Sequence, residues 1–167
     1  ISVVADATST MTHVTAVGSG GPPGYNYGIE VQTGSSAEMF DVKAIAEGNA
    51  TINRAIHTDN GIMKLSHVTV FATGPTGSNN IGIFVFNSST ATMTDVNATC
   101  GGNPADFPRA VYVLMNSSAE IHYSQLTGAG YSLLAGGTST TRVAGTYLNG
   151  PLPVNLVTAG ITLFNCY

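Results

Sequence analysis

The chain has 167 residues, enough for one domain with a substantial buried core. Only 8% of the residues are charged and the net charge is −4, which argues against nucleic-acid binding and against a polybasic membrane-surface site. No apolar run approaches the roughly 20 residues of a membrane-spanning helix, and the 20 glycines with abundant Thr, Ser and Asn favour strands joined by turns.

The chain opens inside a repeating pattern, because its first segment, ISVVADATSTM, aligns with IEVQTGSSAEM from Ile29. A seven-residue phrase occurs four times and returns in a weaker fifth copy: MTHVTAV from Met11, MFDVKAI from Met39, LSHVTVF from Leu65, MTDVNAT from Met93 and IHYSQLT from Ile121. Successive copies begin 26 or 28 residues apart, a period typical of solenoids. We therefore expect a repeat protein, and expect this chain to be a segment of a longer one.

A second phrase lies between copies of the first: YGIEV from Tyr27, RAIHT from Arg54, IGIFV from Ile81, RAVYV from Arg109 and YSLLA from Tyr131. Alternate residues of a strand face opposite sides, so Ile29 and Val31 should point inward and Glu30 outward. Inward residues of successive turns then stack as like on like. Burying each of them contributes roughly 1.5–3 kcal/mol, which makes these columns the main expected source of stability.

The seven-residue phrase predicts a bend, because its first apolar residue and its valine lie an odd number of positions apart. Met11 and Val14 can both face inward only if the chain turns between them. The bend residues of successive turns are then His13, Asp41, His67 and Asp95. We expect these side chains to form a ladder that holds the turns in register. A metal site, or catalysis by His67 with a neighbouring aspartate, is the alternative for this column.

These patterns predict an all-β fold, a right-handed single-stranded parallel β-helix of about six turns. No window sustains the apolar spacing of a helix without a glycine or a turn cluster. Residues 1–167 should form a single domain, with regular turns over residues 1–143 and an irregular final turn or cap over 144–167. The repeat pattern degrades from Thr141 onward, and Pro151 and Pro153 disfavour regular strand pairing nearby.

The repeats resemble those of right-handed parallel β-helix proteins of the pectin-lyase-like superfamily, found in bacterial extracellular and phage tail proteins. The matching residues are Ile81–Val85, Asn87–Ser89 and Met93–Ala98, and again Asn116–Ser118. The resemblance extends from Ile1 to about Val143 and implies an extracellular or cell-surface location. It is specific for the fold and weak for function, since the same coil carries lyases, hydrolases, adhesins and tail fibres.

The longer loops should fall at one corner of the solenoid, where each turn passes to the next. They are Gly18–Asn26, residues 47–53, Thr73–Asn80 and Cys100–Pro108. Loops at an equivalent position of a solenoid project from one edge and often form a binding face.

One outward column carries three ring side chains in consecutive turns, His57, Phe84 and Tyr112. Aromatic side chains in a row can stack on sugar rings or make an apolar contact with another subunit. We therefore expect this column to be a binding face. The binding partner is either a glycan or another subunit. The alternative is that another segment of the same chain covers the column.

The sequence gives little support for catalysis, a metal or a cofactor. Its nine acidic residues are scattered and no DD or DxD pair occurs, so no paired-carboxylate mechanism is indicated by spacing. The two cysteines, Cys100 and Cys166, predict structural or free thiols, with a bridge between them as the alternative. We predict a non-catalytic extracellular module of a surface, fibre or filament assembly that self-associates or binds a polysaccharide. A polysaccharide lyase or glycoside hydrolase is the alternative.

Overall fold

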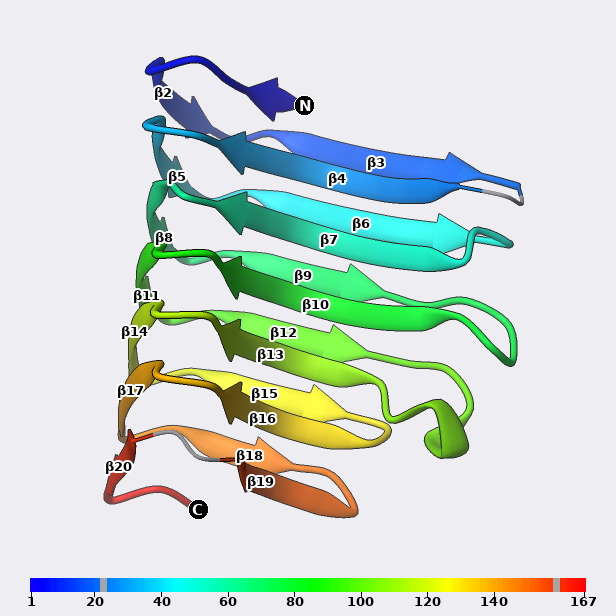
Figure 1. Ribbon diagram of the computed structural model, residues 1–167, viewed down its shortest axis with the longest axis vertical. Coiled ribbons are helices and arrows are strands. Elements are labelled where there is room, and N and C mark those ends of the chain that lie inside the picture. Colours follow the sequence, from blue (N-terminus) through cyan, green and yellow to red (C-terminus); the bar gives the residue numbers. More distant parts are fainter. Residues whose placement is uncertain (22–23, 158–159) are drawn as a thin grey trace.

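The computed structural model describes residues 1–21, 24–157 and 160–167, with the backbone alone at 153–157. Three parallel sheets run along its length (Figure 1). Sheet A contains β1 (Ser2–Val3), β4 (Tyr25–Gln32), β7 (Ile52–Asp59), β10 (Asn79–Phe86), β13 (Arg109–Leu114), β16 (Tyr131–Gly136) and β19 (Leu152–Val157). Sheet B contains β2 (Thr8–Thr12), β5 (Ser36–Phe40), β8 (Ile62–Ser66), β11 (Thr90–Thr94), β14 (Ser118–His122), β17 (Thr140–Ala144) and β20 (Gly160–Phe164). Sheet C contains β3 (Thr15–Gly20), β6 (Lys43–Gly48), β9 (Thr69–Ala72), β12 (Asn97–Cys100), β15 (Gln125–Gly128) and β18 (Tyr147–Asn149).

The chain visits the three sheets in the same order in every turn, so the expected all-β parallel solenoid is confirmed. Five turns, β4–β6 through β16–β18, are complete, and a shortened first turn and a last turn flank them. The sequence predicted about six turns, a small difference. One turn of 3-10 helix, η1 (Pro104–Asp106), lies in a loop at the corner between sheets C and A.

The core consists of the like-on-like columns that the repeat predicts. In sheet A, Ile56 pairs in register with Ile83, and Ile83 with Val111. In sheet B, Met39, Leu65 and Met93 occupy matching positions of β5, β8 and β11. All these side chains are buried. Because neighbouring strands lie about 4.8 Å apart, each column is a continuous apolar rod along the axis of the solenoid.

The bend between sheets B and C occurs at the residues that the odd spacing indicates. His13, Asp41, His67 and Asp95 adopt left-handed backbone conformations, with φ between 53° and 55°. Non-glycine residues adopt this region infrequently, although Asn, Asp and His are enriched there. The same turn repeats at Tyr123, with φ 50°.

The final segment is more regular than the sequence predicted. Strands β18, β19 and β20 pair in parallel with β15, β16 and β17. The expectation that Pro153 prevents pairing is wrong, because β19, which contains Pro153, pairs in parallel with β16. The amide of Leu152 donates to the Gly130 carbonyl, so the neighbouring proline nitrogen faces away from β16 and takes no hydrogen bond from this pairing. Residues 158–159 of the predicted cap lie outside the described residues.

Both cysteines are free thiols. Cys100 is buried, and this burial raises the pKa of its thiol to about 12, so the reactive thiolate is scarce at neutral pH. The predicted structural or free thiols are therefore present, and the alternative bridge is not formed. The described part of the chain contains no helix with the length and hydrophobicity needed to span a bilayer.

Candidate functional site

The outer face of sheet A carries a stack of rings. Tyr27 packs on His57, His57 on Phe84 and Phe84 on Tyr112, with ring centroids 5.1–5.4 Å apart and planes within 29° of parallel. The three predicted residues, His57, Phe84 and Tyr112, are thus in one column, in register across β7, β10 and β13. Their faces are turned toward one another, and only 6% of His57 and 4% of Phe84 is exposed.

Two arginines lie over this stack. The Arg54 guanidinium carbon is 4.4 Å from the centre of the Phe84 ring, and that of Arg109 is 5.1 Å from the Tyr112 ring. Ile81 is their register neighbour in the next column and is 1% exposed, although its side chain faces outward. Both guanidinium groups therefore lie over aromatic rings, a cation–π arrangement that also covers apolar surface.

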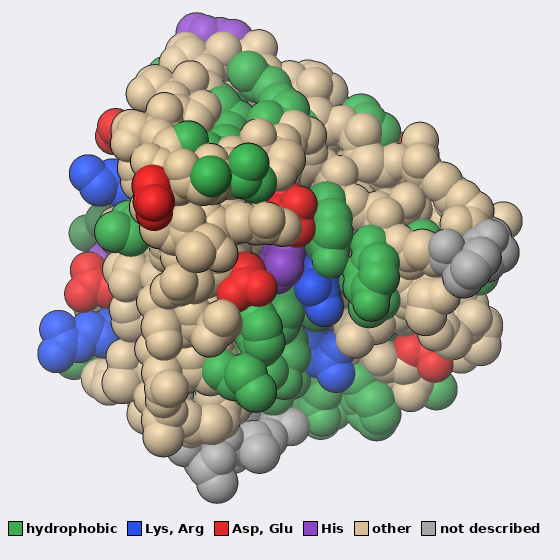
Figure 2. All heavy atoms as spheres, turned by 45° about the horizontal axis from the view of Figure 1, so that its top comes forward, with side chains coloured by type: hydrophobic (Ala, Val, Ile, Leu, Met, Phe, Trp, Pro, Cys, Tyr) green, Lys and Arg blue, Asp and Glu red, His purple; other side chains and the backbone are tan. Residues whose placement is uncertain are grey.

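A groove follows the edge of the stack over β4, β7 and β10. Its volume is about 420 Å³, and it is lined by Tyr25, Tyr27, Glu30, Gln32, Ile52, Arg54, His57, Asp59, Phe84 and Phe86. Tyr112 does not line it. Figure 2 shows acidic, basic and histidine side chains gathered beside hydrophobic ones in the middle of this face. Tyr25 forms an open wall, with 63% of its surface exposed. Rings, an amide, carboxylates and a guanidinium therefore meet in one elongated depression.

His57 lies on the floor of the groove beside a carboxylate. Its Nδ1 is 3.5 Å from Oε1 of Glu30, a distance for an ion pair but long for a hydrogen bond. Burial of the ring lowers the pKa of His57, and the positive charge of Arg54 lowers this pKa further, against the opposing effect of Glu30. The ring is therefore favoured in its neutral form in the folded protein.

The lowered pKa of His57 predicts that stability falls on mild acidification. Below the usual histidine pKa of 6.5 the unfolded chain binds a proton that the folded chain resists, so the free energy of unfolding decreases as the pH falls. We expect this decrease as the pH falls through the usual histidine pKa of about 6.5, and we expect His57→Gln to reduce it. Urea unfolding at a series of pH values measures it. Gln32→Ala, at a groove residue that does not titrate, should leave the pH dependence unchanged, and an equal effect of both variants would contradict the assignment.

The predicted ladder residues lie on the opposite side of the molecule, at the bend between sheets B and C. They form two pairs, with His13 Nε2 3.3 Å from Asp41 Oδ2 and His67 Nε2 3.3 Å from Asp95 Oδ2. The His67 ring also packs on Phe40, with centroids 5.1 Å apart. More than half of each paired side chain is exposed, so water screens both pairs. Their role in holding the register stays a prediction.

In residues 1–21, 24–157 and 160–167, no group of three or more His, Cys, Asp and Glu side chains is placed to hold a metal ion. Comparisons of the chain with protein-family models, with curated proteins and with solved structures found no match.

Two carboxylates, Glu30 and Asp59, do share the groove on sheet A, although they come from different turns. An acidic pair that is assembled from different turns cannot be recognised from the spacing of residues along the sequence.

A column of buried asparagines, which was not predicted from the sequence, lies beneath the loop corner. Asn26 Nδ2 donates to Asn53 Oδ1 at 2.8 Å, and Asn53 Nδ2 donates to Asn80 Oδ1 at 3.0 Å. All three side chains are at most 6% exposed. The available signal was an asparagine directly before the second phrase in three successive turns, in YNY, INR and NNI. The ladder closes the loop ends onto sheet A and so fixes the rim of the groove.

Proposed function

We propose that the chain is a non-catalytic extracellular module of a surface, fibre or filament assembly, and that it binds a glycan along the groove on sheet A. The observation that carries the proposal is the combination of an exposed tyrosine ring with fixed polar groups in this groove. The C–H face of a sugar ring can pack on Tyr25, while its hydroxyl groups can pair with Gln32, Asp59 and the guanidinium of Arg54. A volume of about 420 Å³ suits one or two sugar units of a longer polymer.

The rigid support of these groups favours binding. The groove residues come from strands of a continuous parallel sheet, with Tyr25 in register with Ile52 and Gln32 with Asp59. Side chains on such a frame lose little further freedom when a ligand binds. The extracellular location and the assembly role are supported by the resemblance of the repeats to those of the pectin-lyase-like superfamily in surface and phage tail proteins.

The burial of His57 favours binding over catalysis. Both nitrogens of its ring are buried, and among the described residues neither has a well-formed hydrogen bond, so the ring has no open path for exchanging a proton with a ligand in the groove. A polysaccharide lyase or glycoside hydrolase is the second candidate, because Glu30 and Asp59 line the groove together with Arg54. Cleavage of a polysaccharide that is lost in Glu30→Gln would support this candidate and overturn the non-catalytic proposal.

Removal of the exposed ring should weaken glycan binding. A stacking aromatic group contributes about 0.5–1.5 kcal/mol, so Tyr25→Ala is expected to lower affinity about 2- to 13-fold. Titration calorimetry with a panel of soluble neutral and acidic polysaccharides measures this. The matched control is Tyr147→Ala on sheet C, a tyrosine that is 50% exposed and lies away from the groove. Absence of binding across the panel, or equal losses in both variants, would contradict the proposal.

A further inference from the structure

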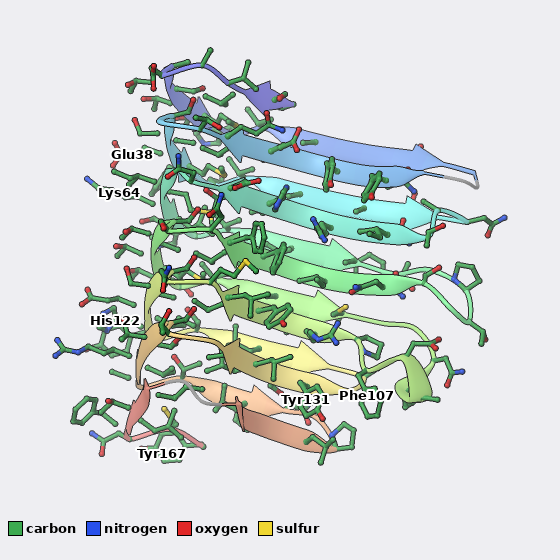
Figure 3. The ribbon with its side chains drawn as sticks, in the orientation of Figure 1. Glu38, Lys64, Phe107, His122, Tyr131 and Tyr167 are labelled. Atoms are coloured by element: carbon green, nitrogen blue, oxygen red, sulfur yellow. The ribbon has the colours of Figure 1, made fainter. Side chains whose placement is uncertain are left out.

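The outer face of sheet B carries a column of alternating charges that the glycan groove does not use. The outward residues at the middle of the seven strands lie in register: Thr10, Glu38, Lys64, Thr92, Glu120, Arg142 and Thr162. The four charged side chains are exposed. Figure 3 shows Glu38 and Lys64 projecting from this side, and acidic and basic side chains alternate along the left edge in Figure 2.

The order of these charges is self-complementary when it is reversed. Thr92 is the middle position, Lys64 and Glu120 lie one strand from it, and Glu38 and Arg142 lie two strands from it. A twofold axis through Thr92, parallel to the strands, would reverse the solenoid axis of a second copy. It would also place sheet B of that copy face to face with sheet B of the first copy. Glu38 then faces Arg142 of the second copy, and Lys64 faces Glu120. Every charge in the column meets an opposite charge.

We propose that two copies of this chain associate through the outer faces of sheet B, with their solenoid axes antiparallel. This inference rests on the proposed role as a module of an assembly. The parallel arrangement is disfavoured by the same column, because it would place each charge opposite its own copy. Like charges that face one another lower the affinity of a complex several-fold, whereas opposite charges fix its register. A C2 interface of this kind needs one self-complementary patch, which the column provides.

The rest of the face allows a second copy to approach. The strands around the charges carry mostly small side chains. Two open hollows lie on this face, one of about 610 Å³ over β11, β14, β17 and β20 and one of about 260 Å³ over β2, β5 and β8. In the column next to the bend, the twofold axis would bring the exposed ring of Phe40 against Ala144, which has only a methyl group. Long charged side chains of one copy can thus extend over the short Thr and Ser side chains of the other.

The size of the face predicts a weak dimer. Seven strands about 4.8 Å apart and five residues of about 3.3 Å each give a flat footprint of roughly 29 by 16 Å per copy. The two copies together bury roughly 1,000 Å², the low end for a specific interface. Salt screens exposed charges over about 8–10 Å, so the dimer should dissociate as the ionic strength rises.

Charge reversal tests both the surface and the orientation. Sedimentation velocity of the full chain, from about 10 to about 500 μM, should show a reversible dimer at low salt. Glu38→Arg places arginine opposite Arg142, and Arg142→Glu places glutamate opposite Glu38, so each is expected to raise the dissociation constant at least about tenfold. The double variant with both changes restores opposite charges across the antiparallel interface and should recover the dimer. In a parallel dimer each of these residues would face its own copy. Like charges would therefore still face each other in the single variants and in the double variant.

The controls separate this inference from the proposed function. Lys43→Glu, on sheet C, makes the same charge change as Arg142→Glu and should leave the dissociation constant unchanged. A monomer at every concentration, or a dimer that is insensitive to all these reversals, would overturn the antiparallel interface. Polysaccharide titration of the same samples reports on the groove alone. A monomer that binds polysaccharide would therefore refute the interface and keep the glycan proposal, and a dimer that binds none would do the reverse.

Discussion

Ile83→Ala is expected to lower the free energy of unfolding by about 2–5 kcal/mol, a large part of the stability of an ordinary domain. Ile83 is fully buried in β10, in register between Ile56 and Val111. The cavity left by the lost methyl and methylene groups cannot close easily. Parallel hydrogen bonds fix the strands above and below at about 4.8 Å, so the neighbouring side chains cannot move along the axis to fill it.

Urea unfolding followed by far-UV circular dichroism measures this loss. Ile62→Ala is the matched control, because Ile62 is 53% exposed on the outer face of sheet B and its truncation should change stability by less than about 0.5 kcal/mol. Each turn of a solenoid contacts only its neighbours, so weakening a central turn should also broaden the transition. Similar losses at Ile62 and Ile83 would contradict the inward column as the source of stability.

The strands and the core were predictable because they depend on periods that the sequence shows directly. The two-residue alternation identified Ile29 and Val31 as inward, and both are fully buried. The odd spacing between Met11 and Val14 required a bend, and the backbone at His13 has the left-handed conformation that makes one. In a repeat protein the same apolar pattern occurs in every turn, so a pattern that recurs in several turns seldom arises by chance.

The character of the outer faces was harder to predict. The sequence indicates that His57, Phe84 and Tyr112 point outward from sheet A, but not whether their rings face a ligand or one another. That choice depends on side-chain rotation and on the arginines of the neighbouring column, which cover the rings at 4.4 and 5.1 Å. The groove that results is lined largely by residues that the repeat pattern treats as ordinary surface, such as Tyr25 and Gln32.

Pairing in the last turn was also beyond the sequence rules. Proline is counted against a strand because it removes a hydrogen bond, and the rule holds only where a partner lies on that side. At Pro153 the nitrogen faces away from β16, since the amide of Leu152 makes the bond to Gly130. Which side of a strand has a hydrogen-bond partner depends on the folded solenoid. It cannot be predicted from the local sequence.

Asn53→Ala is expected to destabilise the protein by about 2–5 kcal/mol, because Asn53 is the central member of the buried asparagine ladder. Its side chain is fully buried, accepts from Asn26 and donates to Asn80. Truncation leaves the Asn80 Oδ1 atom without this donor and removes the acceptor of one of the two bonds that Asn26 Nδ2 donates, the other being to the Glu47 carbonyl. Each unsatisfied buried polar group costs about 1–3 kcal/mol, and the lost volume adds a cavity.

The position in the ladder makes this prediction specific. Asn80 is the last member, because Pro108 stands directly before Arg109, the register partner of Ile81, and offers no amide side chain. Its Nδ2 atom already lacks a partner within the described residues, so Asn80→Ala removes one ladder bond where Asn53→Ala removes two. We expect the smaller loss at Asn80, and almost none for Asn97→Ala on the exposed face of sheet C. Equal losses at Asn53 and Asn80 in urea unfolding would mean that volume, and not the chain of hydrogen bonds, determines the stability of this corner.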